Sequence, residues 1–287
     1  FLREMDGLDF VEAVERLADM AGLSMPKSTH IDPAVTRQRK VALDILEETT
    51  RFFEVGLRAD EGRDAAQYLK QRGLDAVTVK NFRLGYAPRS GLRTALAGKD
   101  FSDDDMIMAG VLGKSDRDSR LYDYFRDRVM FPIENRQGKV IAFGARALGD
   151  AQPKYLNSGD SPTFSKKAVL YGWVQAREAV RRKLPLVVVE GYMDVIALQR
   201  SGIAAAVAPL GTALTPEQIT LLWKLHDEPI LCFDGDAAGQ RAQLRALERI
   251  LPLLEPGRSA RLAMLPSGKD PDDVLGESGP QGLRKIL

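Results

Sequence analysis

Two pairs of aspartates, each with one residue between its members, are the side chains of this sequence best suited to chemistry. Asp234 and Asp236 follow one apolar run, Asp270 and Asp272 follow a second, and a third apolar run ends in Glu190. Carboxylates that converge without histidine or cysteine suit Mg²⁺ or Mn²⁺ rather than zinc. Because clustered carboxylates repel one another, they are tolerated mainly where cations bind between them, as in two-metal phosphoryl-transfer sites. Acids also occur in ordinary surface loops, so the pattern by itself leaves both interpretations open.

The elements that must position these acids are strands and helices that alternate over residues 184–287. This alternation is typical of an α/β fold with a parallel sheet and right-handed crossovers. Each acid then lies at the carboxyl end of a strand, the edge where open α/β sheets bind ligands. The predicted strands are Leu186–Val189, Ala204–Ala208, Ile230–Phe233 and Arg261–Leu265, and the predicted helices are Tyr192–Ser201, one capped by Thr215 and Gln218, and Ala237 to about Leu251.

Short-range geometry should turn each aspartate pair toward one side. Gly235 removes a side chain that would crowd an ion between Asp234 and Asp236. Pro271 is expected to keep Asp270 extended, because the residue before a proline avoids the helical region. Asp270 and Asp272 would then also face together.

Upstream of residue 184 the sequence mixes helical and strand patterns, so the whole chain is expected to be α+β. Ser102 is a good N-cap for three following aspartates, which favours capping over metal binding. Val129–Ile133 and Lys139–Gly144 predict a β-hairpin. Apolar spacing and breakers predict a helix over Asp9–Gly22, a linker over Ser24–Pro33, a long helix from Ala34 to about Leu57, and a helix over Asp64–Gln71.

Charge is distributed unevenly along the chain. Residues 117–183 carry 14 basic and 7 acidic side chains, whereas residues 184–287 carry 10 and 13. A basic middle would attract a phosphate backbone, and an acidic end would attract divalent metal. The competing interpretation is that these side chains only solvate helix faces.

Composition indicates an ordinary globular protein without a disulfide framework. Hydrophobic residues make up 44% of the 287 positions, and Cys232 is the only cysteine. Cys232 is expected to be a buried thiol, and His30 and His226 have no cysteine partners for a zinc site. No apolar run is long enough for a membrane span, so the expected compartment is the cytoplasm. Because the chain begins with Phe1, we expect it to be part of something longer.

Several motifs resemble the Toprim domain of bacterial DnaG-type DNA primases. The Toprim motifs are V-E-G-Y-M-D at 189–194, L-G-T-A-L-T at 210–215, F-D-G-D-A-A-G at 233–239 and D-P-D at 270–272. Upstream, R-D-R-V-M-F-P-I at 126–133, F-G-A-R at 143–146 and P-K-Y-L-N-S at 153–158 resemble the basic subdomain of the primase core. The resemblance runs over most of the chain. It implies three parts: a lead-in helix and linker (1–33), the basic α+β subdomain (34–183) and the Toprim domain (184–287).

The resemblance also implies roles for individual residues. Glu190, Asp234 and Asp236 become the catalytic acids, with Glu190 a candidate general acid/base, and Asp194 is a secondary candidate on the helical face of Glu190. Asp270 and Asp272 complete a cluster for Mg²⁺ or Mn²⁺, with two or more ions expected. The residues implied to contact template or nucleotide are Arg128, Arg146, Lys154, Asn157 and Lys166, with Tyr155 a possible stacking surface for a base. Lys167 stands where the family often has glycine.

The implied activity is synthesis of RNA primers on a single-stranded DNA template, with ribonucleoside triphosphates as substrates and the nascent primer as product. A Toprim nuclease or topoisomerase fragment is the second hypothesis, although no tyrosine is marked as a nucleophile. A non-catalytic nucleic-acid-binding module is the third. The family implies a zinc-binding domain before this segment and a helicase-interacting domain after it. The core is expected to be monomeric and to act at bacterial replication forks.

Overall fold

The computed structural model of the protein describes residues 17–18, 20, 33–211 and 213–287. The chain divides into two compact units, residues 1–40 and residues 41–287. The predicted helix Asp9–Gly22 and linker Ser24–Pro33 lie almost wholly outside the described residues. The predicted long helix is confirmed as α3 (Pro33–Arg58), which begins in the first unit and continues into the second.

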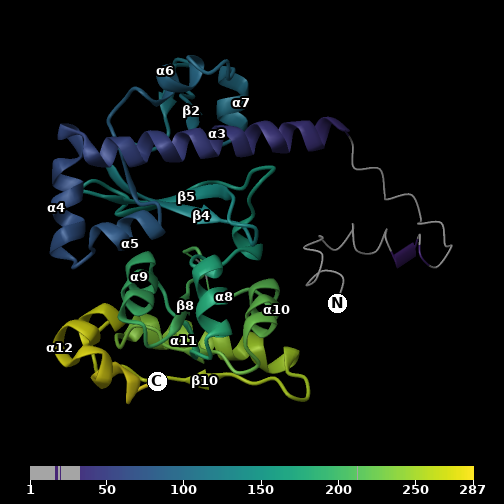
Figure 1. The fold of residues 1–287 in the computed structure, drawn as a ribbon, viewed down its shortest axis with the longest axis vertical. Helices are drawn as coiled ribbons and strands as arrows, with labels where there is room; N and C mark the ends of the chain where they lie inside the picture. Colours follow the sequence, from purple (N-terminus) through teal and green to yellow (C-terminus); the bar gives the residue numbers. More distant parts are fainter. Residues whose placement is uncertain (1–16, 19, 21–32, 212) are drawn as a thin grey trace. The chain divides into compact units, whose positions relative to one another are not determined.

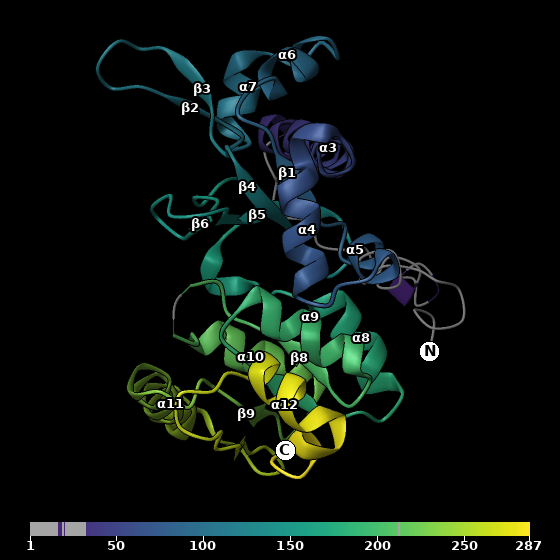
Figure 2. The same ribbon diagram turned by 90° about the vertical axis from the view of Figure 1, so that its left-hand side faces the viewer.

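An antiparallel sheet with the strand order β1-β4-β5-β6 forms the centre of the polypeptide before residue 184. The predicted hairpin is confirmed as β4 (Arg128–Glu134) and β5 (Val140–Ala147), with Gly138 at positive φ in the turn. Figure 2 shows a second, smaller hairpin of β2 and β3 that extends away from this sheet. The remaining elements are η1 (Asp60–Gly62), α4 (Arg63–Gln71), α5 (Ala76–Asn81), β1 (Gly85–Ala87), α6 (Leu92–Ala97), α7 (Asp103–Met108), β2 (Leu112–Lys114), β3 (Leu121–Asp123), β6 (Tyr155–Asn157) and η2 (Lys166–Ala168).

The sequence after residue 170 forms a parallel sheet with the strand order β10-β9-β7-β8, covered by helices (Figure 1). The strands are shorter than predicted. Cys232 and Ala263 nevertheless still donate backbone hydrogen bonds of 2.9 Å to the neighbouring strand, so the differences concern boundaries. The elements are α8 (Trp173–Arg181), β7 (Leu186–Val188), α9 (Tyr192–Ser201), β8 (Ala205–Val207), α10 (Pro216–Leu225), β9 (Ile230–Leu231), α11 (Ala237–Ile250), η3 (Leu251–Leu253), β10 (Arg261–Leu262) and α12 (Pro271–Arg284).

Capping side chains set several helix boundaries as the sequence predicts. Thr215 accepts a hydrogen bond from the Gln218 backbone N–H, and the Gln218 side chain accepts one from Thr215 N–H in return. Ser102 accepts from Asp105 N–H at the start of α7, so the acidic triplet there is a helix terminus, as expected. The helix α12 was not predicted, and its consequence for Asp272 appears at the site.

Alternating side chains of both sheets build the core. On β4, Val129 and Phe131 pack in a cluster that also holds Val187 of β7 and Ile196 of α9. Met130, on the opposite face of β4, packs in a second cluster with apolar residues of α3, α6 and α7. The antiparallel sheet therefore lies between these helices and the helical layer of the parallel sheet. No described helix combines the length and apolar character needed to cross a membrane.

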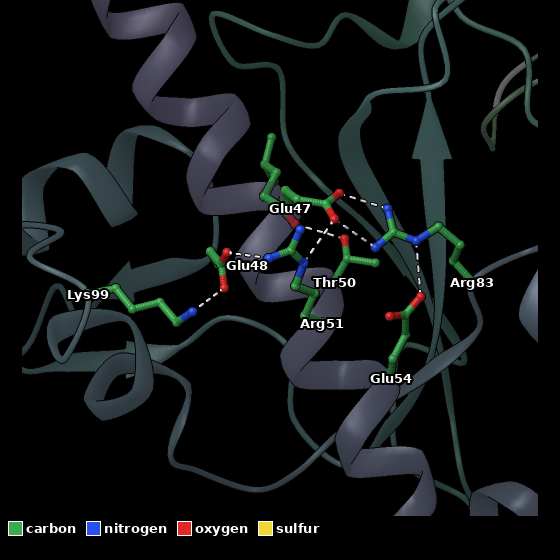
Figure 3. Close-up of polar contacts among 8 residues, drawn as sticks. Glu47, Glu48, Thr50, Arg51, Glu54, Arg83 and Lys99 are labelled. Carbon is green, nitrogen blue, oxygen red and sulfur yellow. Dashed lines mark hydrogen bonds and ion pairs between the residues drawn. The ribbon is translucent and has the colours of Figure 1, made fainter.

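A network of ion pairs holds the polar face of α3 (Figure 3). Arg83 donates to Glu47 at 2.7 Å and to Glu54 at 3.0 Å, although these glutamates lie two turns apart on the helix. Arg51 donates to Glu47 and Glu48 on the more exposed side. The network ties α3 to the turn before β1, where Arg83 itself has positive φ.

Candidate active site

Glu190 and Asp234 meet at the carboxyl ends of the neighbouring strands β7 and β9. Glu190 Oε1 accepts a hydrogen bond of 3.1 Å from the Asp234 backbone N–H. Asp234 Oδ1 is buried and has no hydrogen-bond partner, which is an uncommon state for a carboxylate oxygen. Burial raises the pKa of Asp234 to about 7, and the negative charges of Glu190, Asp270 and Asp236 contribute. The pKa of Glu190 is also raised by burial, with a contribution from Asp236.

Asp236 lies at the N-terminus of α11, where its carboxylate serves the helix. Its Oδ1 accepts from the N–H groups of Ala238 at 2.8 Å and Gly239 at 2.7 Å. The expected reason for Gly235 is wrong. A Cβ at Gly235 would lie 2.1 Å from the Pro266 carbonyl oxygen, so glycine here makes room for protein rather than for an ion.

The close approach at Gly235 is what joins the two aspartate pairs. Gly235 N–H donates to the Lys269 carbonyl oxygen at 2.8 Å, and Gly268 N–H donates to the Gly235 carbonyl oxygen at 3.2 Å. These bonds bring the loop before α12 against the turn after β9. Asp270 is thereby near enough to raise the pKa of Asp234.

Asp270 has the predicted conformation, but Asp272 does not. Asp270 is extended (φ −96°, ψ 171°) and accepts from Asp273 N–H at 2.7 Å. Asp270 and Asp272 were expected to face one side together, but Pro271 begins the helix α12 and Asp272 lies in its first turn. Asp272 instead forms an ion pair of 2.9 Å with Arg72, at the end of α4.

Asp194 is more deeply buried than the other acids of the site. Asp194 and Glu190 were expected to lie on one helical face. This is wrong, because Glu190 precedes α9 and only Asp194 lies in its first turn. Asp194 Oδ2 accepts from Gly191 N–H at 3.1 Å. Burial raises the pKa of Asp194 to about 8, with further contributions from Asp270, Asp234 and Asp272.

Four of these acids share one cavity of about 380 Å³ with residues from the polypeptide before residue 184. Glu190, Asp194, Asp234 and Asp270 line one side. The other side is lined by residues of β6 and its preceding loop and by the end of α4: Lys154, Tyr155, Asn157 and Arg72. Tyr155 is 45% exposed, which leaves its ring open to contact.

Five residues that the sequence groups with this site do not line the cavity: Asp236 and Asp272, which make the helix-cap and ion-pair contacts described above, and the three basic residues Arg128, Arg146 and Lys166. Arg128 is buried and donates to the Pro153 carbonyl oxygen at 2.7 Å, which supports the loop that carries Lys154. The Arg146 guanidinium lies 4.2 Å from the centre of the Tyr68 ring. Lys166 is half-buried in η2, and its backbone N–H donates to Asp160. Burial lowers the pKa of Arg128.

The donor set fits a hard divalent cation, although the side chains do not already surround one. Among the described residues, no three acidic, histidine or cysteine side chains are gathered as a metal-binding group. The oxygens of Glu190, Asp234 and Asp270 are of the type that Mg²⁺ and Mn²⁺ accept. The unpartnered Asp234 Oδ1 and the mutual repulsion of the acids are conditions that a bound cation relieves.

The sequence analysis did not assign two residues of this site, Arg72 and Tyr192. Arg72 reaches Asp272 across 200 positions (272 − 72), and only the fold brings them together. Tyr192 sits inside the recognised V-E-G-Y-M-D motif but was given no role, although it lines the same cavity. The one signal available for Tyr192 was its position in this motif, two residues after Glu190.

Comparisons with known proteins agree with the two parts of this arrangement. The model of the DNA primase catalytic core, N-terminal domain, matches residues 52–177, and that of the Toprim domain matches residues 185–262. DNA primase of Pasteurella multocida is 41% identical over 293 residues, which is 100% of this chain and 50% of the relative. DNA primase of Pseudomonas aeruginosa is 42% identical, over 99% of this chain and 44% of the relative. The chain therefore spans about half the length of these relatives.

Solved structures share the fold over a larger part of their length. A DNA primase domain from Pseudomonas aeruginosa superposes with a TM-score of 0.80 at 43% identity, covering 85% of this chain and 77% of that one. A DnaG primase catalytic domain bound to single-stranded DNA has a TM-score of 0.79 at 39% identity, covering 88% and 79%. An Aquifex aeolicus primase with zinc-binding and RNA polymerase domains has a TM-score of 0.79 at 33% identity, covering 100% and 68%. Sequence motifs, site geometry and these matches together place the chain in the family of DnaG-type DNA primase catalytic cores.

Proposed function

We propose that this chain joins ribonucleotides into RNA primers on a single-stranded DNA template, in a reaction that depends on divalent metal. One observation carries the proposal. The acids at the ends of β7 and β9 face Lys154, Tyr155 and Asn157 across a single cavity. Metal-binding groups and nucleic-acid-binding groups are thus brought to the same place, as nucleotidyl transfer requires.

The chemistry follows from the residues around this cavity. Glu190, Asp234 and Asp270 would hold Mg²⁺ or Mn²⁺, with Asp236 and Asp272 as further ligands once they leave their helix-cap and ion-pair contacts. The bound cations supply charge neutralisation for the triphosphate and for the developing charge on the leaving group. Asn157 binds the nucleotide from the opposite side, and Lys154 contacts phosphates of the template and of the nucleotide.

The transfer itself breaks one bond and forms one. A primer 3′-oxygen forms a bond to the α-phosphorus, the bond from that phosphorus to the bridging oxygen breaks, and pyrophosphate leaves. Glu190, whose pKa burial raises, accepts the proton of the 3′-hydroxyl. Positioning and electrostatic stabilisation contribute most, because no covalent intermediate is needed.

The remaining assignments extend this function to the longer protein. We assign residues 34–183 as the basic subdomain and 184–287 as the Toprim domain. Arg128, Arg146 and Lys166 then act on the template near the cavity or support the loops that do. Zinc would be held outside these residues, in a domain of the kind named for the Aquifex aeolicus primase, and a replicative helicase would be contacted by another part of the full-length protein.

A template-directed assay with labelled ribonucleotides tests the proposal. Wild type should extend primers with Mg²⁺ or Mn²⁺, and Asp234→Asn should lose at least about a hundredfold in rate, because it removes one charged metal ligand. Asp227→Asn, at an exposed position outside the cavity, is the matched control and should retain activity. Full activity of Asp234→Asn would contradict the metal site. Cleavage of DNA would favour a Toprim nuclease, and binding without turnover a non-catalytic module.

A further inference from the structure

Tyr192 reaches from the parallel sheet into the antiparallel one. It is the first residue of α9, and only 8% of its surface is exposed. Its ring stacks on Phe131 of β4 with centroids 4.9 Å apart and planes at 11°. The edge of Tyr171 closes the other side at 4.7 Å. The position of the ring is therefore set by packing and not by its hydroxyl group.

The Tyr192 hydroxyl group extends beyond this packing to the edge strand β6. It donates a hydrogen bond of 2.6 Å to Asn157 Oδ1. The Tyr192 side chain passes over Gly144, which pairs with Asn157 between β5 and β6. A Cβ at Gly144 would lie 2.2 Å from Tyr192 Cζ, so glycine at this position is what lets the tyrosine pass.

This bond decides which way the Asn157 amide faces. Because Oδ1 accepts from Tyr192, the amide nitrogen Nδ2 points the other way, toward Gly211 at the cavity wall. A Cβ at Gly211 would lie 3.1 Å from Nδ2. Among the described residues, nothing accepts a hydrogen bond from Nδ2.

We propose that Tyr192 is a positioning residue that holds the Asn157 amide with its N–H groups toward the cavity, as donors to an acceptor oxygen of the incoming ribonucleoside triphosphate. The inference rests on the proposed function. The nucleotide is chosen over the template because Asn157 faces Glu190, Asp194 and Asp234 across one cavity, where the triphosphate would be held. Without Tyr192, the amide is free to turn its acceptor oxygen toward the substrate, where it repels phosphate oxygens.

Tyr192→Phe tests the inference because it removes the hydroxyl and keeps the stacked ring. KM for ribonucleotides should rise roughly five- to tenfold, the effect of about one lost hydrogen bond, with kcat and template Kd unchanged. The matched control is Tyr86→Phe, since Tyr86 is equally buried and donates one hydrogen bond of 3.3 Å, to Asp127, away from the cavity. An unchanged KM in Tyr192→Phe, or an equal rise in Tyr86→Phe, overturns the inference.

A double-mutant cycle with Asn157→Ala separates positioning from a general effect on structure. If Tyr192 acts through Asn157, the double variant should have the same KM as Asn157→Ala alone. If the KM increases of the two single variants instead multiplied in the double variant, Tyr192 would act by a route that does not involve Asn157. Gly144→Ala gives a second approach, because its added methyl group displaces the tyrosine without removing the hydroxyl, and KM should rise again. If wild type made no primers, the proposed function would fail, and ribonucleotide Kd in the same variants would still decide the inference.

Discussion

At the residue scale, the carboxylates of the cavity are held in a state that the metal-free protein tolerates poorly. Asp194 and Asp234 have raised pKa values chiefly because they are buried, and neighbouring acids add to the effect. Cys232 lies close by and is completely buried, as predicted, and burial raises the pKa of its thiol to about 12. The thiol is therefore inert, and the reactivity of this region belongs to its oxygens.

Stability of the metal-free protein should fall as pH rises. The folded state holds the protons of Asp194 and Asp234 more tightly than the unfolded chain, with pKa values of about 8 and about 7. The stability that these two protons contribute is therefore fully present below the unfolded-state pKa of aspartate, near 4. It is lost as pH rises from about 4 to about 8. We expect Tm to fall by several degrees from pH 5 to pH 8.

Variants and metal identify the groups responsible for this pH dependence. Asp234→Asn should flatten the fall in Tm, whereas the exposed control Asp227→Asn should keep the wild-type slope. Saturating Mg²⁺ should raise Tm most at pH 8, because the cation binds the ionised form. A Tm that rises from pH 5 to pH 8 without metal would show that these carboxyls are not strained.

At the element scale, polar contacts at helix ends and faces position the site from outside it. Asp236 and Asp270 are both N-caps, so two proposed metal ligands are also the residues that begin α11 and α12. The ion pairs around Arg83 perform a similar task for α3, far from any reacting group (Figure 3). Substitution of the Arg83 ion pairs can therefore change the stability of the fold without touching the proposed metal ligands.

Arg83→Ala should lower the free energy of unfolding by about 1–3 kcal/mol, because two half-buried glutamates lose their charged donor. Arg51→Ala is the matched control, since Arg51 pairs with Glu47 from a side chain that is 59% exposed, and its loss should cost about 0.5 kcal/mol or less. Denaturant unfolding measures both. If Arg83→Ala lowered the free energy of unfolding no more than Arg51→Ala, the stabilising role of the Arg83 ion pairs would be contradicted. Primer synthesis should survive in both variants.

At the scale of the whole molecule, the two sheets share one core and complete one site. The cluster that contains Val129 and Phe131 also contains Val187 and Ile196, so the two sheets are packed together rather than merely linked. The ion pair of Arg72 with Asp272 and the bond of Tyr192 to Asn157 cross the same boundary. The relation between the proposed metal ligands and the proposed template-binding groups is thus set by interior packing.

Template binding should depend steeply on salt, because the proposed contacts are to phosphates. The slope of log Kd against log salt concentration should decrease by about one unit in Lys154→Ala, which removes one phosphate contact. Lys224→Ala, on α10 and outside the cavity, should leave the slope unchanged. Anisotropy with labelled single-stranded DNA gives both slopes. A wild-type affinity that hardly changes with salt would contradict electrostatic binding of the template.

The sequence by itself determined most features that depend on neighbours along the chain, although the start of α12, with its capping box of Asp270 and Asp273, was not predicted. Apolar runs followed by acids predicted the parallel sheet and its functional edge, and the capping box of Thr215 and Gln218 and the β4–β5 hairpin were predicted from local patterns. Asp234 and Glu190 meet as expected because the carboxyl ends of parallel strands share one edge.

Only the tertiary structure decided which distant groups modify these acids. It paired Asp272 with Arg72, placed Gly235 against Pro266, and made Arg128 a support for a loop. These contacts join residues from different elements, and no short-range spacing encodes such contacts. The two carboxylate pairs could therefore be recognised from sequence as a candidate metal site, whereas the cavity that unites Asp234 and Asp270 with Lys154 and Asn157 exists only because two sheets pack on one core.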